Sequence, residues 1–244
     1  MKRFFFILLH VSLLMVSVTG CFINLDPNGS LITSGDEIER TYTATDLGTF
    51  DRLDMGSAYR ITVVPGNTPS MTVKGDRDDV NDLELNTRTN TLNVRYNKNR
   101  IRRYTLTIRI TMPILRGVVF SGASKSDVAG FRNLNDLSID LSGASKANFD
   151  VQANRVNLDL SGASKIDFRG SGNNLRADVS GASELDGFDY AFVDATLDVS
   201  GASHAYVNTS NSLNVTASGA SKVRYRGNPS IKQNVSGASK VERD

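Results

Sequence analysis

Charged residues occupy one fixed position after a repeated Ser-Gly-Ala-Ser motif. The residue that follows each copy is, in order, Lys125, Lys146, Lys165, Glu184, His204, Lys222 and Lys240. If the copies stack, these side chains form a ligand-facing column that could bind an acidic polysaccharide or lipopolysaccharide. The simpler interpretation is a charged outer face that keeps a sheet soluble and discourages sideways pairing.

A second column consists of carboxylates that lie two residues before the motif. It contains Asp140, Asp159, Asp178 and Asp198. Stacked carboxylates repel each other, and a bound Ca²⁺ would relieve that repulsion. No Gly-Gly-x-Gly-x-Asp calcium repeat accompanies them, so we prefer a solvated face balanced by neighbouring Lys, Arg or Asn. We therefore predict no metal site and no cofactor.

Catalytic chemistry has little support in this chain. His204 is the one histidine outside residues 1–20, the expected signal peptide. This excludes catalytic mechanisms that need two histidines. Glu184 and His204 would lie one coil apart and could act as general acid and base. We expect a surface role for both and predict no catalytic residue.

Basic residues are densest between residues 95 and 104. Arg95, Lys98, Arg100, Arg102 and Arg103 alternate with Tyr96 and Tyr104. This cluster could contact anionic lipid headgroups or glycans, and a charged hairpin turn is the simpler account.

The motif itself is the most specific signal in the sequence. It begins at Ser121, Ser142, Ser161, Ser180, Ser200, Ser218 and Ser236, with spacings of 18 to 21 residues. Apolar and polar residues alternate before and after it, which predicts two strands joined by a bend. One such unit cannot bury its apolar face alone, whereas stacked units form a continuous core. We predict a parallel β-helix with about 18–21 residues per coil.

Glycine recurs at each bend. These glycines are Gly122, Gly143, Gly162, Gly181, Gly201, Gly219 and Gly237. Without a Cβ, each lets the chain turn tightly while adjacent coils stay in contact. We expect the neighbouring Ala and Ser to be small because the corner is narrow.

The first part of the chain contains export signals. Residues 1–20 have a basic start, an apolar run and Val18-Thr19-Gly20 before Cys21, which is the layout of a lipoprotein signal peptide. Cys21 is the sole cysteine, so we expect it to be lipidated. Residues 21–40 are expected to form a flexible tether, and Ile23 in place of aspartate favours the outer membrane of a Gram-negative host.

Two β-rich regions are expected after the tether. Residues 41–116 contain alternating strands and one degenerate repeat entry, Leu53 to Ala58, and are interpreted as an N-terminal β segment that caps the solenoid. Residues 117–244 form the seven-repeat β-helix. The chain ends shortly after the last repeat, so its final coil could be closed by terminal charges or could dock on another molecule. The oligomeric state stays open.

Three features together resemble the family called putative auto-transporter adhesin, head GIN domain. They are the lipoprotein signal motif that ends at Cys21, the β-rich region of residues 41–116 and the repeated Ser-Gly-Ala-Ser coils. The resemblance covers about Phe50 to Lys240. It implies a right-handed parallel β-helix on an exported protein that is often a lipoprotein, and it supplies no catalytic residues.

The sequence therefore favours a non-enzymatic cell-envelope lipoprotein, an adhesin or scaffold that binds a glycan or another envelope protein. The alternative is a polysaccharide-active β-helix enzyme, a lyase or glycoside hydrolase. Such enzymes build clefts from long loops and use aromatic platforms, for which Tyr190, Phe192 and Tyr206 are the candidates. The net charge of +2 and the compartment argue against nucleic acid as a partner. The ligand and the membrane face are not predicted.

Overall fold

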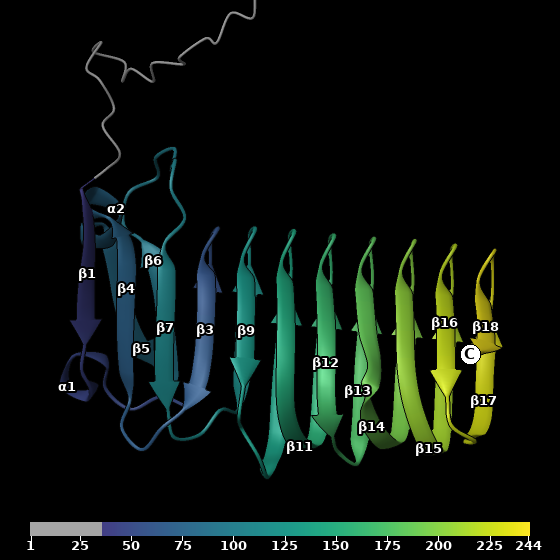
Figure 1. The fold of residues 1–244 in the computed structure, drawn as a ribbon. Helices are drawn as coiled ribbons and strands as arrows, with labels where there is room; N and C mark the ends of the chain where they lie inside the picture. Colours follow the sequence, from purple (N-terminus) through teal and green to yellow (C-terminus); the bar gives the residue numbers. More distant parts are fainter. Residues whose placement is uncertain (1–35) are drawn as a thin grey trace, which may run out of the picture. The chain divides into compact units, whose positions relative to one another are not determined.

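The computed structural model describes residues 36–244, and the seven repeats within them form a β-solenoid of about seven turns (Figure 1). The leader, Cys21 and the expected tether up to residue 35 lie outside the described residues. The end of the predicted tether, residues 37–40, is not a tether but part of a strand that pairs within the sheet. No helix within residues 36–244 is long and apolar enough to cross a membrane.

The chain alternates short strands with tight turns. The first part contains β1 (Glu37–Tyr42), α1 (Ala44–Leu47), β2 (Arg52–Gly56), β3 (Arg60–Pro65), β4 (Ser70–Asp76), α2 (Arg77–Asn81), β5 (Leu83–Arg88), β6 (Thr91–Tyr96) and β7 (Thr107–Met112). The repeats contain β8 (Gly117–Ser121), β9 (Lys125–Ala129), β10 (Leu134–Leu141), β11 (Lys146–Leu160), β12 (Lys165–Ser171), β13 (Asn174–Val179), β14 (Glu184–Val199), β15 (His204–Ala217), β16 (Lys222–Arg226), β17 (Ser230–Val235) and β18 (Lys240–Arg243).

Each repeat contributes one strand to each of two facing layers. The strand before the motif pairs in parallel with its equivalent in the next coil, as in Ile139 opposite Leu158. The strand after the motif does the same, as in Ala147 opposite Ile166. All four of these side chains are buried between the layers. The predicted right-handed parallel β-helix and its alternating apolar columns are therefore confirmed.

The Ser-Gly-Ala-Ser motif forms the corner between the two layers. Gly162 has φ +73°, and a Cβ on it would lie 2.5 Å from the carbonyl oxygen of Gly143 in the preceding coil. That same oxygen accepts a hydrogen bond from the Ala163 amide at 2.8 Å. Glycine is therefore required both by the left-handed backbone and by the close approach of the next coil.

The last serine of the motif faces the interior and the alanine does not. Ser145 is fully buried, and its hydroxyl donates to the Ser142 carbonyl oxygen at 2.8 Å. Ser164 makes the equivalent bond to Ser161. Ala144 and Ala163 are exposed, so crowding explains the glycine. The serine is explained by its buried hydroxyl, which finds a hydrogen-bond acceptor within its own corner.

The coils do not follow the order of the sequence at the N-terminal end. Residues Leu53 and Met55 of β2 pair with Val118 and Phe120 of β8, which confirms the degenerate repeat entry. On its other side, β2 pairs with β6, and β3 likewise pairs with both β9 and β7. The coil formed by β6 and β7 is thus outermost, although it follows β2 and β3 in the chain.

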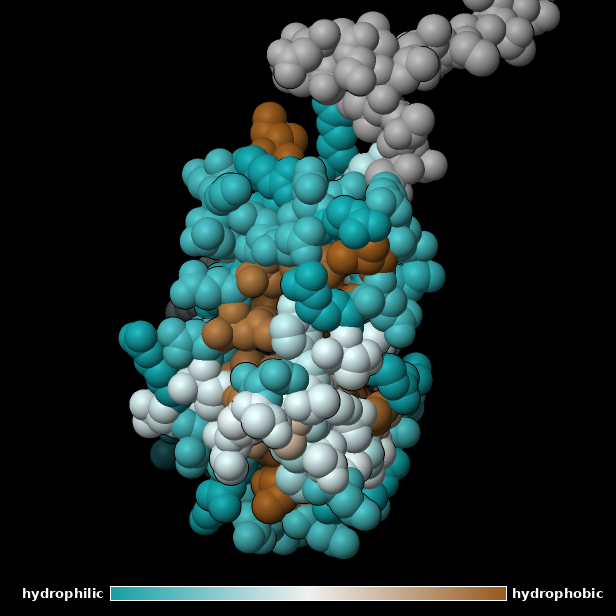
Figure 2. All heavy atoms as spheres, turned by 90° about the vertical axis from the view of Figure 1, so that its left-hand side faces the viewer, coloured by the Kyte–Doolittle hydropathy of each residue, from teal (hydrophilic) through white to brown (hydrophobic). Residues whose placement is uncertain are grey.

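Antiparallel strands cover this outermost coil. β4 pairs with β7 and β1 pairs with β4, while β5 pairs with β6. Side chains such as Ile38 and Leu83 pack against the core from this side. Figure 2 faces this end and shows a largely hydrophilic surface with separate apolar patches.

Candidate binding surfaces

The column after the motif is continuous on the outer face of one layer. Its members pair in register in the order Lys125, Lys146, Lys165, Glu184, His204, Lys222 and Lys240. Arg60 of β3 extends it at the N-terminal end, since Arg60 pairs with Lys125. The repeat motif does not identify Arg60, because the β2–β3 corner has the sequence Gly-Ser-Ala-Tyr in place of Ser-Gly-Ala-Ser.

Charges in the middle of the column neutralise one another. Lys165 Nζ lies 2.7 Å from Glu184 Oε1, and this hydrogen bond raises the pKa of Lys165. Lys222 Nζ lies 2.7 Å from Glu242 Oε1 of β18. The His204 ring stacks parallel to that of Tyr206, with 6.4 Å between centroids. Glu184 and His204 are neighbours in register, but the Glu184 carboxylate forms its ion pair with Lys165.

Three adjacent cations at the N-terminal end lack such partners. Arg60, Lys125 and Lys146 are exposed, and the ion pairs of this column found within residues 36–244 involve Lys165 and Lys222 only. We call Arg60, Lys125 and Lys146 the basic stripe. Strands of a sheet lie about 4.8 Å apart, so the stripe presents regularly spaced positive charge to solvent.

The aspartate column also stacks in register on the other layer. Asp140 pairs with Asp159, Asp159 with Asp178, and Asp178 with Asp198. Burial and, secondarily, the Asp159 and Asp54 carboxylates raise the pKa of Asp140. Among the described residues, no group of three or more His, Cys, Asp or Glu side chains is arranged to hold a metal ion.

The aromatic residues that the enzyme alternative would need as a platform lie mostly inside the solenoid. Tyr190 and Phe192 are 0% and 2% exposed. Tyr190 stacks on Phe168 with 4.3 Å between ring centroids, and its hydroxyl accepts a hydrogen bond from the Ala153 amide at 3.0 Å. These two residues therefore cannot form a surface platform for a sugar. Gly170 and Gly172 in the adjacent coil leave the space that Tyr190 fills.

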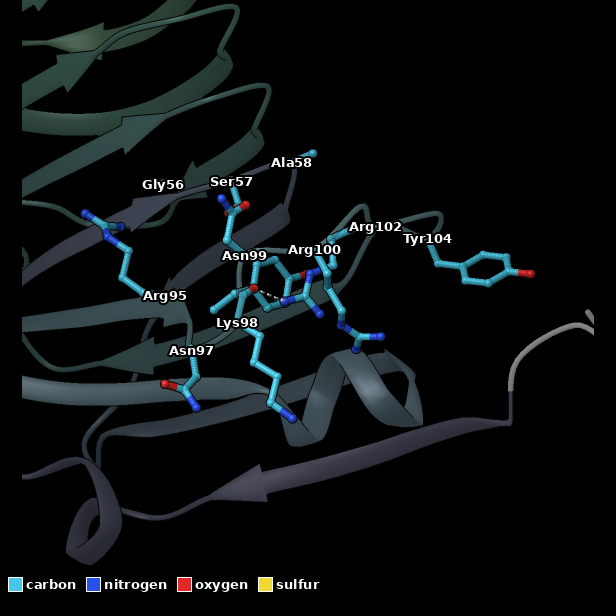
Figure 3. Close-up of a pocket in the computed structure, with 11 residues that line it drawn as sticks. Gly56, Ser57, Ala58, Arg95, Asn97, Lys98, Asn99, Arg100, Arg102 and Tyr104 are labelled. Carbon is cyan, nitrogen blue, oxygen red and sulfur yellow. Dashed lines mark hydrogen bonds between the residues drawn. The ribbon is translucent and has the colours of Figure 1, made fainter. Parts of the chain in front are cut away.

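A pocket of about 360 Å³ lies beside the outermost coil (Figure 3). Its lining residues come from the β2–β3 corner, the end of β6 and the loop of residues 97–106: Gly56, Ser57, Ala58, Arg95, Tyr96, Asn97, Lys98, Asn99, Arg100, Arg102 and Tyr104. This is where the basic cluster predicted from the sequence lies.

Most arginines of that cluster are held by carboxylates. Arg102 donates to Asp79 at 2.6 Å, to Asp82 and to the Lys98 carbonyl oxygen at 2.7 Å, and its guanidinium stacks on Tyr96 at 3.8 Å. The hydrogen bond from Arg102 lowers the pKa of Asp82. Arg100 also bonds Asp79, at 2.8 Å.

Arg95 also forms an ion pair, in which its Nη2 lies 2.5 Å from Asp54 Oδ1. Of the five basic residues in the cluster, Lys98 and Arg103 form no ion pair with residues 36–244. The acidic sequence of α2 and its flanks, residues 76–82, was the available signal that carboxylates would meet these arginines.

Comparison with known proteins agrees with this architecture. The family model for the putative auto-transporter adhesin, head GIN domain, matches residues 49–229. No curated protein matches the chain.

Several solved structures resemble the fold at low sequence identity. A putative adhesin from Bacteroides fragilis is 18% identical with a TM-score of 0.78, covering 85% of this chain and 97% of the other. A putative lipid binding protein from Parabacteroides distasonis is 16% identical with a TM-score of 0.68, covering 86% and 97%. A putative adhesin from Parabacteroides merdae is 15% identical with a TM-score of 0.66, covering 86% and 98%.

Proposed function

The chain belongs to the putative auto-transporter adhesin, head GIN domain family, and on this premise we propose that it is a non-enzymatic, lipid-anchored envelope protein that binds anionic polymers. The basic stripe is the observation that carries the proposal. Three cations without an ion pair among residues 36–244, at the spacing of adjacent strands, match a ligand that itself repeats negative charge along its length.

The names of similar proteins agree with a role in surface binding. The Bacteroides fragilis and Parabacteroides merdae proteins are called putative adhesins, and one from Parabacteroides distasonis is called a putative lipid binding protein. A rigid solenoid suits such a role, because its columns keep their spacing without a ligand present and binding orders few side chains.

The positions of two sets of side chains argue against the enzyme alternative. Tyr190 and Phe192 are core residues and cannot stack on a sugar at the surface. Glu184, the carboxylate of the conceivable acid-base pair, is bonded to Lys165. We therefore propose recognition of a glycan without cleavage.

Anchoring at the outer membrane is part of the proposal. Acylation of Cys21 would hold the protein at the cell envelope, and Ile23 favours the outer membrane over the inner one. Replacing Cys21→Ser should move the protein from the membrane fraction to the soluble one. Unchanged membrane association would contradict the anchor.

Binding is tested with an array of uronate-containing and sulfated polysaccharides probed by the Cys21→Ser protein. Lys125→Glu combined with Lys146→Glu should weaken binding at least tenfold, which is about 1.4 kcal/mol. Arg176→Glu with Lys232→Glu is the matched control, because it changes the net charge equally on the other layer. Equal loss in both variants would reject the stripe, and release of new reducing ends by the same preparation would favour the enzyme.

A further inference from the structure

The loop of residues 97–106 replaces the tight corner in the outermost coil. It joins β6 to β7, whose neighbours β2 and β3 are joined by the short corner at residues 57–59. Figure 1 shows it projecting beyond the row of corners. Ile101 in this loop is 93% exposed and Tyr104 is 44% exposed.

Ion pairs at the base of the loop explain this exposure. The residues on either side of Ile101 are Arg100 and Arg102, and both bond to Asp79 of α2. Arg102 is further fixed by Asp82 and by stacking on Tyr96. With both neighbours held against the protein, Ile101 is presented to solvent. The ring of Tyr104, at the rim of the pocket, points away from the other lining residues (Figure 3).

The composition of the tip suits a lipid interface. Isoleucine can enter the boundary between headgroups and acyl chains, tyrosine is enriched at that depth, and arginine pairs with phosphate. Arg103, between Ile101 and Tyr104, is exposed and forms no ion pair among the described residues. An apolar tip with the exposed Arg103 beside it is thus displayed beyond the corners.

The described part of the chain begins at the same end of the molecule as this loop. The described chain starts beside α2, where the Arg77 amide donates to the Asp36 carbonyl oxygen at 3.0 Å and their side chains form an ion pair at 2.6 Å. α2 also holds the loop through Asp79. Cys21 precedes Asp36 by fifteen residues, a segment that spans at most about 50 Å.

We propose that the loop of residues 97–106 is a second membrane contact, in which Ile101 and Tyr104 enter a phospholipid headgroup layer and Arg103 pairs with lipid phosphate. This rests on the lipid anchoring at Cys21 proposed above. One such loop binds weakly alone, but the anchor raises its effective concentration at the bilayer. The contact fixes the N-terminal end of the solenoid at the membrane.

A fluorescent reporter tests the contact directly, because the chain contains no tryptophan. The lipidated full chain carrying Ile101→Trp is reconstituted on phosphatidylcholine vesicles containing phosphatidylglycerol. Its emission should shift to the blue and be quenched by brominated lipid. Ile114→Trp is the matched control, since Ile114 is 50% exposed between β7 and β8 and should show neither effect.

The outcomes separate the two proposals. If the wild-type protein does not float with the vesicles, the anchor is rejected. If it floats but the tryptophans at positions 101 and 114 emit alike, the loop contact is overturned and the anchor stands. Adding Arg103→Glu to Ile101→Trp should reduce the blue shift on anionic vesicles; an unchanged shift would remove Arg103 from the contact.

Discussion

At the scale of single residues, stacking places each side chain beside its equivalents in the coils above and below. A single surface charge has little effect on stability, but its repetition in each coil stacks like charges that repel one another, as for Asp140 and Asp159. An opposite charge in the same column gives an ion pair instead, as for Lys165 and Glu184. The energetic effect of a residue therefore depends on its column more than on its own coil.

Replacing Asp140→Asn should stabilise the protein at neutral pH. The pKa of Asp140 is raised in the fold, so ionisation disfavours the folded state once the pH exceeds the ordinary value of about 3.9. Removing the charge should add roughly 0.5 kcal/mol, the scale of like charges on adjacent strands. Urea unfolding should show the gain at about pH 7 and its loss near pH 3, where aspartate is protonated in both states. A gain that is equal at both pH values would contradict this cause.

Replacing Tyr190→Phe should destabilise the solenoid by about 1–2 kcal/mol, since it leaves a buried amide without its acceptor. The lost bonds are the one from the Ala153 amide to the Tyr190 hydroxyl at 3.0 Å and the one that this hydroxyl donates to the Ala153 carbonyl oxygen at 3.3 Å, while the stack on Phe168 remains. Tyr206→Phe is the control, because Tyr206 lies on the outer face and is half-buried. Equal unfolding free energies for the two variants would show that the hydroxyl is dispensable.

At the scale of elements, the corner is the least tolerant position. Replacing Gly162→Val places a branched side chain at φ +73° and against the Gly143 carbonyl oxygen. We expect a loss of about 3 kcal/mol or more from strain and displacement of the adjacent coil. Lys165→Val, three residues later, should cost no more than about 1 kcal/mol, the value of a surface ion pair. Calorimetry compares them, and similar melting temperatures would refute the corner's role.

The repeated elements could be predicted from the sequence, whereas the irregular ones could not. Each coil repeats the same apolar columns, so aligning the motifs already gives the register of Ile139 with Leu158. Insertion of β2 and β3 between later coils depends on long-range pairing that no local pattern encodes. The partners of Arg95 and Arg102 lie 41 and 23 residues away in sequence, so a cluster that reads as free charge is largely paired.

Tyr190 shows a further limit at this scale. Its spacing within the repeat did not reveal that the side chain turns inward, because β14 shifts register against both adjacent coils. The signal lay one coil earlier, in Gly170 and Gly172, whose missing side chains leave room for the ring.

At the scale of the whole molecule, stability should be the sum of contacts between adjacent coils. Deleting residues 201–218 removes one complete repeat and joins Ser200 to Gly219, which restores an intact Ser-Gly-Ala-Ser corner. The coil beyond the deletion should then stack on β14, with Ile231 and Val235 meeting Ala195 and Val199. We expect a folded, shorter solenoid with unchanged circular dichroism per residue and a melting temperature a few degrees lower.

A deletion out of phase provides the control for that experiment. Removing residues 201–209 takes away about half a coil and joins Ser200 to Ser210, so the next strand would enter the wrong layer without a corner. This variant should lose cooperative unfolding, and a cooperative transition in it would contradict the nearest-neighbour account. Because the basic stripe lies at the other end of the column, the in-phase deletion should also bind anionic polysaccharide with unchanged affinity. Loss of binding there would place the ligand on the later coils, and so would reject Arg60, Lys125 and Lys146 as the site.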